Sequence, residues 1–459
     1  MNKTRLIAVA MLLAAASNYG NVFAQDQRLN VSLQELYQMA ERQNTSIKSF
    51  QSAVSEAEAG IKSAEAERLP DLDASLSFSY LGNGRIWDRN FKNGFGVDIP
   101  HYGNNFALKA QWAVYTGGAI SSGISLAKMN AEMARLNATD NTQRVRFLLT
   151  GYYLQLHNLK NQEQVFDENI ALTETLIAHT EKRQQEGVVL RNDITRYELQ
   201  LESLRLGRTQ VQNQMRIINH QLLTALGQAE VCTKGGETAA ASASYADEPM
   251  VVTTADTTLF STPLGQLTFQ YWQNEATQSA TPLQKSSLAI QMSEQKERLQ
   301  KASLRPSVAI VAEEHLDGPI TIDIPNLNNN FNYWFVGVGA RYSFGSLWKD
   351  KKRVKQAQLA TQHARDEHAV LTETIDNAVQ AAYTQYLTSL TTLETNQKSV
   401  ELAQQNYEVV SNRYSNGLAL VTDMIDAANQ RLDAQLDLVG SRIDVLYNFY
   451  NLRYITSTL

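Results

Sequence analysis

Two periodicities alternate along this chain and divide it into helices and strands. Over most of its length, apolar residues recur every three or four positions, the spacing that places them along one side of an α-helix. In four short stretches they recur at every second position, which is typical of a β-strand with one apolar and one polar face. The chain holds only eight prolines in 459 residues, which favours long helices. We predict the strands at about 71–80, 105–115, 307–314 and 333–344.

The predicted helices are long and pair as coiled coils. The first begins at Ser32, an N-cap with Glu35 at the third helical position, and breaks once at Asn44. The stretches 119–186 and 346–416 contain no proline, so each would extend about 100 Å at roughly 1.5 Å per residue. A heptad seam, typical of coiled-coil packing, follows the first of these. Its members are Leu190, Ile194, Tyr197, Leu201, Leu204, Val211, Met215, Ile218 and Leu222.

Two glycines mark the tips of helical hairpins. Gly187 and Gly417 each interrupt a helical pattern that restarts at once, and glycine permits the left-handed conformation that ends a helix. V-V-L-R-N-D follows the first and L-A-L-V-T-D the second, so that Asp193 matches Asp423 at an offset of 230 positions. This match predicts a duplicated unit of helix, two strands, long helix, tip and helix. We place the repeats at 25–228 and 263–459, joined by a linker or peripheral segment at 229–262.

The strands have the length and pattern of membrane-spanning strands. About ten residues cross a bilayer at a tilt, and four of the five tryptophans lie in or beside the strands, as in an aromatic girdle. Because an open sheet edge is not tolerated in lipid, closure requires several copies of the chain. A soluble antiparallel sheet is the alternative. The third strand alternates less cleanly, since Val311 and Glu314 fall on the wrong faces. The positions expected to face lipid are Leu76, Phe78, Trp112, Trp334, Val336 and Tyr342.

The N-terminal residues 1–24 have the build of a cleaved secretory signal. Lys3 and Arg5 precede an apolar run, and small residues end it at Ala24. The formal net charge of −6 at pH 7 becomes −8 once those two basic residues are removed, which argues against nucleic acid as a partner. No later run of 18 apolar residues predicts a membrane-spanning helix, so a membrane role must use the strands. The single Cys232 cannot form an internal disulfide.

No enzyme, cofactor or metal site is predicted. None of the seven histidines has the spacing of a metal or catalytic site, and His363 and His368 lie five apart, on different sides of a helix. The G-V-G sequence at 337–339 lacks the third glycine of a nucleotide-binding loop and lies inside a strand pattern. The sequence therefore carries none of the common motifs of a catalytic, metal-binding or nucleotide-binding site.

The order of several motifs resembles that of the TolC-like outer-membrane efflux family over nearly the whole mature length. The resemblance implies a homotrimer whose chains each contribute four strands to one shared transmembrane β-barrel, continued by an α-helical coiled-coil barrel through the periplasm. It implies a passive exit duct in the outer membrane, docked to a periplasmic adaptor and an inner-membrane pump. The motifs are L-x-x-L at Leu33 with Asn44, L-P-D-L-D-A-S-L-S-F-S-Y from Leu69 to Tyr80, Y-T-G-G from Tyr115 to Gly118, the Tyr152 and Tyr153 pair, and the tips R-Q-Q-E-G-V-V-L-R-N-D and R-Y-S-N-G-L-A-L-V-T-D-M-I-D.

The resemblance also assigns a periplasmic gate. Tyr414 matches the family's gate tyrosine and Asp193 its partner acid, with Asn192 beside it. Ala419 stands where the best-known members carry arginine, so a salt bridge is not available at that position. We expect a hydrogen bond from the Tyr414 hydroxyl to Asp193 or Asn192 to replace it in part, worth about 1 kcal/mol.

Asp423 and Asp426 match the family's acidic ring. A spacing of three places them on one helix face, and threefold symmetry would bring six carboxylates around the channel axis. Crowded carboxylates attract cations. We therefore expect these residues to bind polyvalent cations at the periplasmic mouth.

Two other classes of protein share part of this pattern. A periplasmic coiled-coil scaffold or adaptor would have the helices and tips but no need of lipid-facing strands, and it is the main alternative. A monomeric porin-like channel would need many more strands than four. The polar strand positions, with Asp71, Asp73, Lys109 and Arg341, predict a wet lumen of mixed charge and do not specify a cargo.

Overall fold

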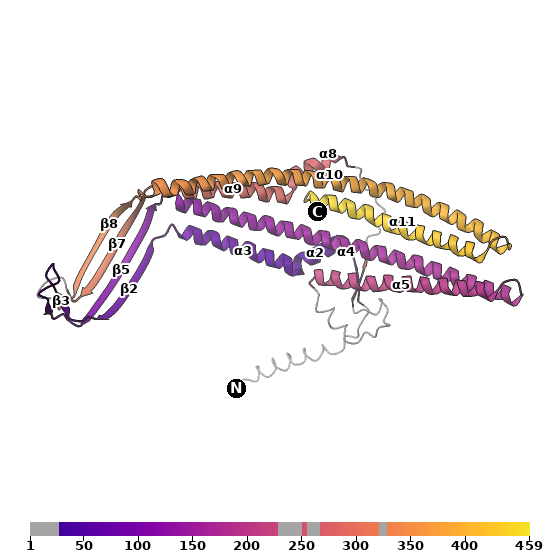
Figure 1. The fold of residues 1–459 in the computed structure, drawn as a ribbon, viewed down its shortest axis with the longest axis horizontal. Coiled ribbons are helices and arrows are strands. Elements are labelled where there is room, and N and C mark those ends of the chain that lie inside the picture. The colour runs from indigo at the N-terminus through magenta and orange to yellow at the C-terminus, as the bar shows by residue number, and fades with distance from the viewer. Residues whose placement is uncertain (1–26, 228–249, 255–266, 321–327) are drawn as a thin grey trace, which may run out of the picture. The chain divides into compact units, whose positions relative to one another are not determined.

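The computed structural model describes residues 27–227, 250–254, 267–320 and 328–459 (Figure 1). The predicted signal, Cys232 and most of the predicted linker lie outside these residues. The elements in chain order are β1 (Gln27–Val31), α2 (Leu33–Gln43), α3 (Thr45–Ala66), β2 (Asp71–Tyr80), β3 (Gly84–Ile86), β4 (Phe95–Val97), β5 (Tyr102–Tyr115), α4 (Ala119–Gln185), α5 (Arg191–Ala225), β6 (Met250–Thr254), α8 (Phe269–Ser279), α9 (Thr281–Ala302), β7 (Ser307–Gly318), β8 (Phe331–Arg341), α10 (Ser346–Ser415) and α11 (Val421–Ile455).

The chain forms two compact units, and each takes elements from both halves of the sequence. The helical unit comprises Met1–Phe50, Ala138–Thr281 and Thr372–Leu459, and the strand unit comprises Gln51–Asn137 and Pro282–Leu371. Each half of the chain repeats one order of elements with matching lengths. The helices α2 and α8 have 11 residues, α3 and α9 have 22, and α5 and α11 have 35. This match supports the internal duplication.

The strand unit contains a four-stranded antiparallel sheet in the order β2-β5-β7-β8 (Figure 1). Each half of the chain supplies one pair of strands, and the pairs join through β5 and β7. The first strand lies where the sequence predicts it. β5 begins earlier, at Tyr102, because Tyr102, Gly103 and Asn104 pair with the end of β2 although their composition resembles a turn. β7 is longer than predicted and extends to Gly318, because its final residues pair with the beginning of β8.

One face of this sheet is apolar and exposed. Residues that pair directly across antiparallel strands lie on the same face, and Leu76 pairs with Phe106. The exposed fractions are 63% for Leu76, 77% for Phe78, 71% for Trp334 and 65% for Val336. Such a surface requires an apolar environment or another protein to cover it. Trp112 also lies on it, and its indole nitrogen donates a hydrogen bond of 2.9 Å to the Arg68 carbonyl.

The apolar face is irregular at two positions, Glu314 and Tyr342. Glu314 lies on it between Leu108 and Trp334, as the irregular alternation of the third strand predicts, and accepts a hydrogen bond of 3.2 Å from Asn332. Tyr342 lies one residue beyond the end of β8, because the backbone turns there into α10, with the Ser346 amide donating to the Ser343 carbonyl at 3.0 Å. Its ring contacts Phe344 edge-on, with the centroids 5.1 Å apart.

The opposite face is polar. Lys109 lies 3.6 Å from Glu313 on the next strand, and His315 Nε2 lies 2.8 Å from the same carboxylate. Asn105 donates to Asp317 across the same pair of strands. The predicted wet face therefore carries mixed charges in direct cross-strand contact.

Two small paired segments are not predicted from the sequence. β3 and β4 form a short antiparallel hairpin between β2 and β5, in a stretch whose glycines and asparagines indicate only turns. β1 and β6 pair in parallel, from Gln27 with Met250 to Val31 with Thr254. β6 lies within the predicted linker and holds the place in the second half of the chain that β1 holds in the first.

The core of the helical unit lies between α2, α4, α5 and the end of α11. α2 begins with the predicted capping box, in which the Ser32 amide donates to Glu35 at 2.8 Å. Asn44 forms the predicted break and donates to the Ala225 carbonyl at 2.6 Å. The Tyr37 and Thr150 hydroxyls lie 2.5 Å apart in the core. Its fully buried side chains include Leu36, Leu149, Tyr153, Leu222 and Leu226.

The long helices have the predicted extent. α4 has 67 residues and α10 has 70, so each is about 100 Å long at 1.5 Å per residue. The members of the predicted heptad seam from Ile194 to Leu222 are all buried in α5, and Asn219 and Leu223 are buried in addition to them. Leu190 is the exception and is 73% exposed, because it is the N-cap residue that precedes the first helical turn. Among the described helices, none has both the length and the apolar composition to span a membrane.

Candidate functional site

Both hairpin tips end their long helix in the same way. Gly187 and Gly417 adopt φ angles of +75° and +74°. At each tip the glycine amide bonds back three residues and the following amide bonds back five: Val188 to Arg183 at 2.9 Å, and Leu418 to Arg413 at 2.8 Å. This is a Schellman motif, which satisfies the last helical carbonyls and places glycine at the left-handed position. The hairpins are α4 with α5 and α10 with α11 (Figure 1).

Asp193 and Asp423 close the other side of each tip. The Leu190 amide donates to the Asp193 carboxylate at 3.3 Å, and the Leu420 amide donates to Asp423 at 3.0 Å. Each carboxylate occupies the third position of its helix, where it caps the free amides and interacts favourably with the helix dipole. The two acids matched by the duplication thus share one structural role.

Among the described residues, the Tyr414 hydroxyl does not form the expected hydrogen bond with Asp193 or Asn192. Tyr414 is only 7% exposed, and its hydroxyl neighbours that of Tyr197. Its side chain packs into an apolar cluster, whereas Asp193 turns back to cap its own helix and Asn192 is exposed. Asp193 and Asn192 therefore lie at the first tip and Tyr414 at the second, and no hydrogen bond among the described residues joins Tyr414 to either of them.

Asp423 and Asp426 are both exposed on α11, whereas Met424 and Ala427 between and beside them are buried. The predicted pair thus lies on one side of the helix. Asp426 accepts a hydrogen bond of 2.9 Å from Gln430, one turn further along. Asp426 is exposed to solvent, and the residue that caps the start of α11 is Asp423.

Buried residues from three helices, α5, α10 and α11, meet at the tips. We call the buried residues of this group the tip cluster: Tyr197, Tyr407, Tyr414, Val421, Met424 and Ala427. The rings of Tyr197 and Tyr414 meet edge-on, with centroids 6.5 Å apart. The Arg183 guanidinium lies 5.5 Å from the Tyr414 ring centroid. The heptad pattern predicts that Tyr197 is buried, but it does not identify its partners, which lie on α10 and α11.

Burial changes the acidity of this cluster. The pKa of Tyr197 is raised, chiefly by burial and then by the neighbouring Tyr414 hydroxyl. Burial also raises the pKa of Tyr407, and the Arg431 guanidinium, 4.1 Å from its ring centroid, opposes this in part. Tyr197 and Tyr407 therefore remain neutral around pH 7.

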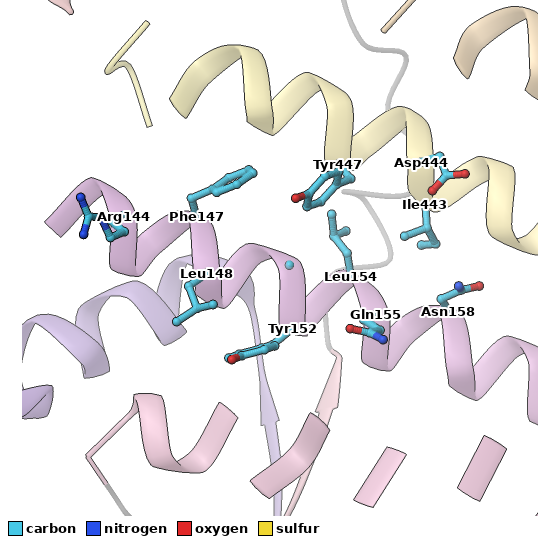
Figure 2. A pocket seen from close by; sticks show the side chains of 11 residues that line it. Arg144, Phe147, Leu148, Tyr152, Leu154, Gln155, Asn158, Ile443, Asp444 and Tyr447 are labelled. Atoms are coloured by element: carbon cyan, nitrogen blue, oxygen red, sulfur yellow. The ribbon is translucent and has the colours of Figure 1, made fainter. Parts of the chain in front are cut away.

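A groove of about 550 Å³ lies between α4 and α11, away from the tips (Figure 2). Figure 2 shows Phe147 and Leu154 of α4 facing Ile443 and Tyr447 of α11. Asp444 lies at its rim, largely exposed, and partial burial raises its pKa. Within the described residues, no group of three or more side chains is arranged to hold a metal ion.

The motif tyrosines divide between the groove and the core. Tyr152 lines the groove, whereas the adjacent Tyr153 is buried and donates to the Val31 carbonyl at 3.2 Å. One residue of the pair thus anchors α4 to β1, and the other shapes the groove surface.

Long paired helices together with an open sheet that has an exposed apolar face are typical of one class of protein, the outer-membrane channels with a periplasmic helical part. The outer membrane efflux protein family model matches residues 36–228 and 272–457. The chain belongs to this family, as the sequence resemblance indicates. The family consists of efflux channels rather than enzymes, and the protein is an outer-membrane exit duct that extends into the periplasm.

Solved structures share the fold at low sequence identity. VceC from Vibrio cholerae is 14% identical, with a TM-score of 0.73 over 93% of this chain and 96% of VceC. CusC is 15% identical, with a TM-score of 0.74 over 94% of this chain and 93% of CusC. The open state of MtrE from Neisseria gonorrhoeae is 13% identical, with a TM-score of 0.68 over 95% and 93% of the two chains. No curated protein sequence matches significantly.

Proposed function

We propose that three copies of this chain form one passive duct through the outer membrane and the periplasm. The observation that carries this proposal is the open sheet. β2 and β8 are edge strands with unpaired backbone groups, and the apolar face beside them is exposed. Lipid does not tolerate such edges. Antiparallel pairing of β8 with β2 of the next copy would give twelve strands in a closed barrel.

The alternative is a periplasmic scaffold or adaptor, in which the same face would be covered by protein. Washing membranes with alkaline or high-salt buffer discriminates between them, because the duct stays in the membrane fraction and the scaffold is released. Reconstitution of the purified chain into planar lipid bilayers then tests the duct directly. Ion conductance is expected, and its absence from correctly folded, membrane-embedded protein would refute the proposal.

The tips are the proposed contact for a periplasmic adaptor, which together with an inner-membrane pump would open the duct. Four aliphatic side chains project from the two tip turns: Val188 is 60% exposed, Leu190 73%, Leu418 69% and Leu420 70%. Exposed apolar groups gathered at turns mark protein contact sites. They flank Tyr414, Asp193 and Asn192, which we retain as the gate region.

The acidic ring is proposed to bind polyvalent cations at the mouth of the duct. Because Asp423 also caps α11, its replacement would disturb the helix start. Asp426→Asn removes a carboxylate without that complication, so block of reconstituted channels by polyvalent cations should weaken several-fold. Exposed Asp433, two turns further along α11, provides the matched control as Asp433→Asn. Equal block of the Asp426→Asn and wild-type channels would remove the ring assignment.

A further inference from the structure

We propose that the first turns of α10 bind the phosphate groups of anionic phospholipids in the periplasmic leaflet of the outer membrane. We call four exposed lysines of these turns the basic segment: Lys349, Lys351, Lys352 and Lys355. This inference rests on the proposed function, because a duct places the start of α10 directly below the membrane. It assigns a lipid ligand to the end of α10 that is opposite its tip.

The basic segment begins directly after the sheet (Figure 1). β8 ends at Arg341 and α10 begins at Ser346. At about 1.5 Å per residue, all four lysines lie within roughly 15 Å of the helix start. The headgroup layer beside the hydrocarbon core is about 5–7 Å thick, and a lysine side chain can extend its charge toward it. Where the sheet spans the membrane, the basic segment therefore lies within reach of the headgroup phosphates.

The acids around the basic segment are already paired with other residues. The acid within the segment is Asp350, and its carboxylate lies 3.0 Å from the Arg353 guanidinium. The two glutamates of α9 are also paired, one with Lys301 at 2.6 Å and the other with Arg365 of α10 at 2.8 Å. None of the four lysines forms an ion pair with a residue that the structure describes. Their charges are therefore available to attract an anion.

An exposed tryptophan lies on the same side of α10 as three of these lysines. Positions 348, 351, 352 and 355 have the spacing of one helix face, whereas Val354 is buried. Trp348 is 62% exposed, and Phe344, just before the helix, is 70% exposed. Exposed aromatic rings beside lysines are typical of the membrane interface, where the rings contact lipid and the amines stay hydrated. An anionic phospholipid matches both features, because its phosphate suits the lysines and its acyl boundary suits the rings.

The internal duplication shows that the fold does not require this charge. Y-T-G-G before α4 corresponds to Y-S-F-G before α10. The first turns of α4, residues 119–127, read A-I-S-S-G-I-S-L-A and carry no charge. The first charged residue of α4, Lys128, is paired with Glu65 at 3.3 Å. Positive charges near the start of a helix also oppose its dipole. The lysines of α10 therefore do not serve helix formation, which favours a role in binding.

The test is native mass spectrometry of the purified full-length protein in detergent, with phosphatidylglycerol or the zwitterionic phosphatidylethanolamine as the added probe. We expect the wild type to retain phosphatidylglycerol at least tenfold more strongly. The combined variant Lys351→Gln, Lys352→Gln and Lys355→Gln should bind phosphatidylglycerol at least tenfold more weakly, because each basic residue near the phosphate contributes about fivefold. Arginine at the same three positions should preserve the preference.

The matched control removes the same charge far along the long helices, through Lys160→Gln, Lys182→Gln and Lys398→Gln at exposed positions of α4 and α10. It should leave the lipid preference unchanged. Equal retention of the two lipids by the wild type would overturn the inference. So would equal retention of phosphatidylglycerol by the wild type and the combined variant at 351, 352 and 355. Displacement of phosphatidylglycerol by an equal concentration of inorganic phosphate would also overturn it, because the ligand would then be a free anion.

Conductance in planar bilayers separates this inference from the function on which it rests. The glutamine variant at 351, 352 and 355 should conduct like the wild type, because the pore itself is unchanged. Wild-type channels that conduct but show no preference for phosphatidylglycerol would overturn the lipid site alone. Wild-type protein that forms no channels would overturn the proposed duct. Lys352→Gln alone, which should weaken phosphatidylglycerol binding about fivefold, keeps the test decisive if the combined variant fails to assemble.

Discussion

Replacement of Gly117 by alanine should strongly destabilise the connection between the sheet and α4. Gly117 has a φ angle of +67°, where an L-residue costs about 1–2 kcal/mol. A Cβ atom there would lie 2.6 Å from the Ala302 carbonyl oxygen and 2.9 Å from Cβ of Arg305. The carbonyl belongs to the backbone and cannot rotate away, so displacement adds about 1–3 kcal/mol. We expect a total loss of about 2–5 kcal/mol for Gly117→Ala.

Two neighbouring glycines separate the contributions. Gly118 has a φ of +98°, and the nearest atom to an added Cβ is 3.8 Å away, so Gly118→Ala should lose only the conformational part, about 1–2 kcal/mol. Gly123 lies inside α4 with nothing within 4 Å of an added Cβ. Gly123→Ala should therefore stabilise the helix, by up to about 1 kcal/mol.

The assay is thermal unfolding of the three purified variants, followed by helical circular dichroism, with the yield of membrane-inserted protein as a second readout. The expected order of midpoints is Gly123→Ala, wild type, Gly118→Ala and Gly117→Ala, from highest to lowest. Equal midpoints for the Gly117 and Gly118 variants would refute the argument, because they would show that the close approach to Ala302 contributes nothing.

Two further predictions concern the core and the tips. Burial raises the pKa of Tyr37 to about 12 from an ordinary value of 10.0. Because the folded protein holds the Tyr37 proton more tightly than the unfolded chain, the stability that neutral Tyr37 contributes is complete below pH 10 and is lost as the pH rises through 12. Tyr37→Phe should cost about 1 kcal/mol at neutral pH through the lost bond to Thr150, yet lose less stability than the wild type between pH 10 and 12. Parallel alkaline unfolding curves would contradict this assignment. Leu190→Ser combined with Leu420→Ser should leave conductance intact but weaken capture of a periplasmic adaptor by at least tenfold in a binding assay, and unchanged capture would exclude the tip turns as the docking site.

The sequence alone is sufficient to predict most of the architecture, because periodicity reports directly on which face of an element is buried. The lengths of α4 and α10 follow from an unbroken helical pattern, and both tip glycines follow from its interruption. Pairing partners do not follow in this way. The first residues of β5 have turn-like composition and become a strand only because β2 lies beside them, and β6 lies in an Ala/Ser/Thr-rich segment where β1 supplies the pairing.

In the candidate site, too, the sequence pattern predicts which side chains are buried but not which partners they contact. The pattern predicts that Tyr197 is buried, but whether its hydroxyl finds a partner depends on residues some 200 positions away. Asp193 illustrates competition between roles: its place three residues after Leu190 suits a helix cap, and this local bond is made in preference to the longer one to Tyr414. Short-range hydrogen bonds of this kind are readable from the sequence once the helix start is known.

Disulfide cross-linking between β2 and β8 tests the central claim most directly. These strands are the two edges of the sheet, three strand spacings apart, or about 14 Å, whereas a disulfide requires Cα atoms within about 7 Å. In a Cys232→Ser background, Ser75→Cys would be combined with a cysteine at successive positions from 331 to 338 and oxidised in the membrane. At the matching position we predict covalent dimers and trimers, with no larger species. Monomers at every position, from protein recovered in the outer membrane, would contradict the shared barrel.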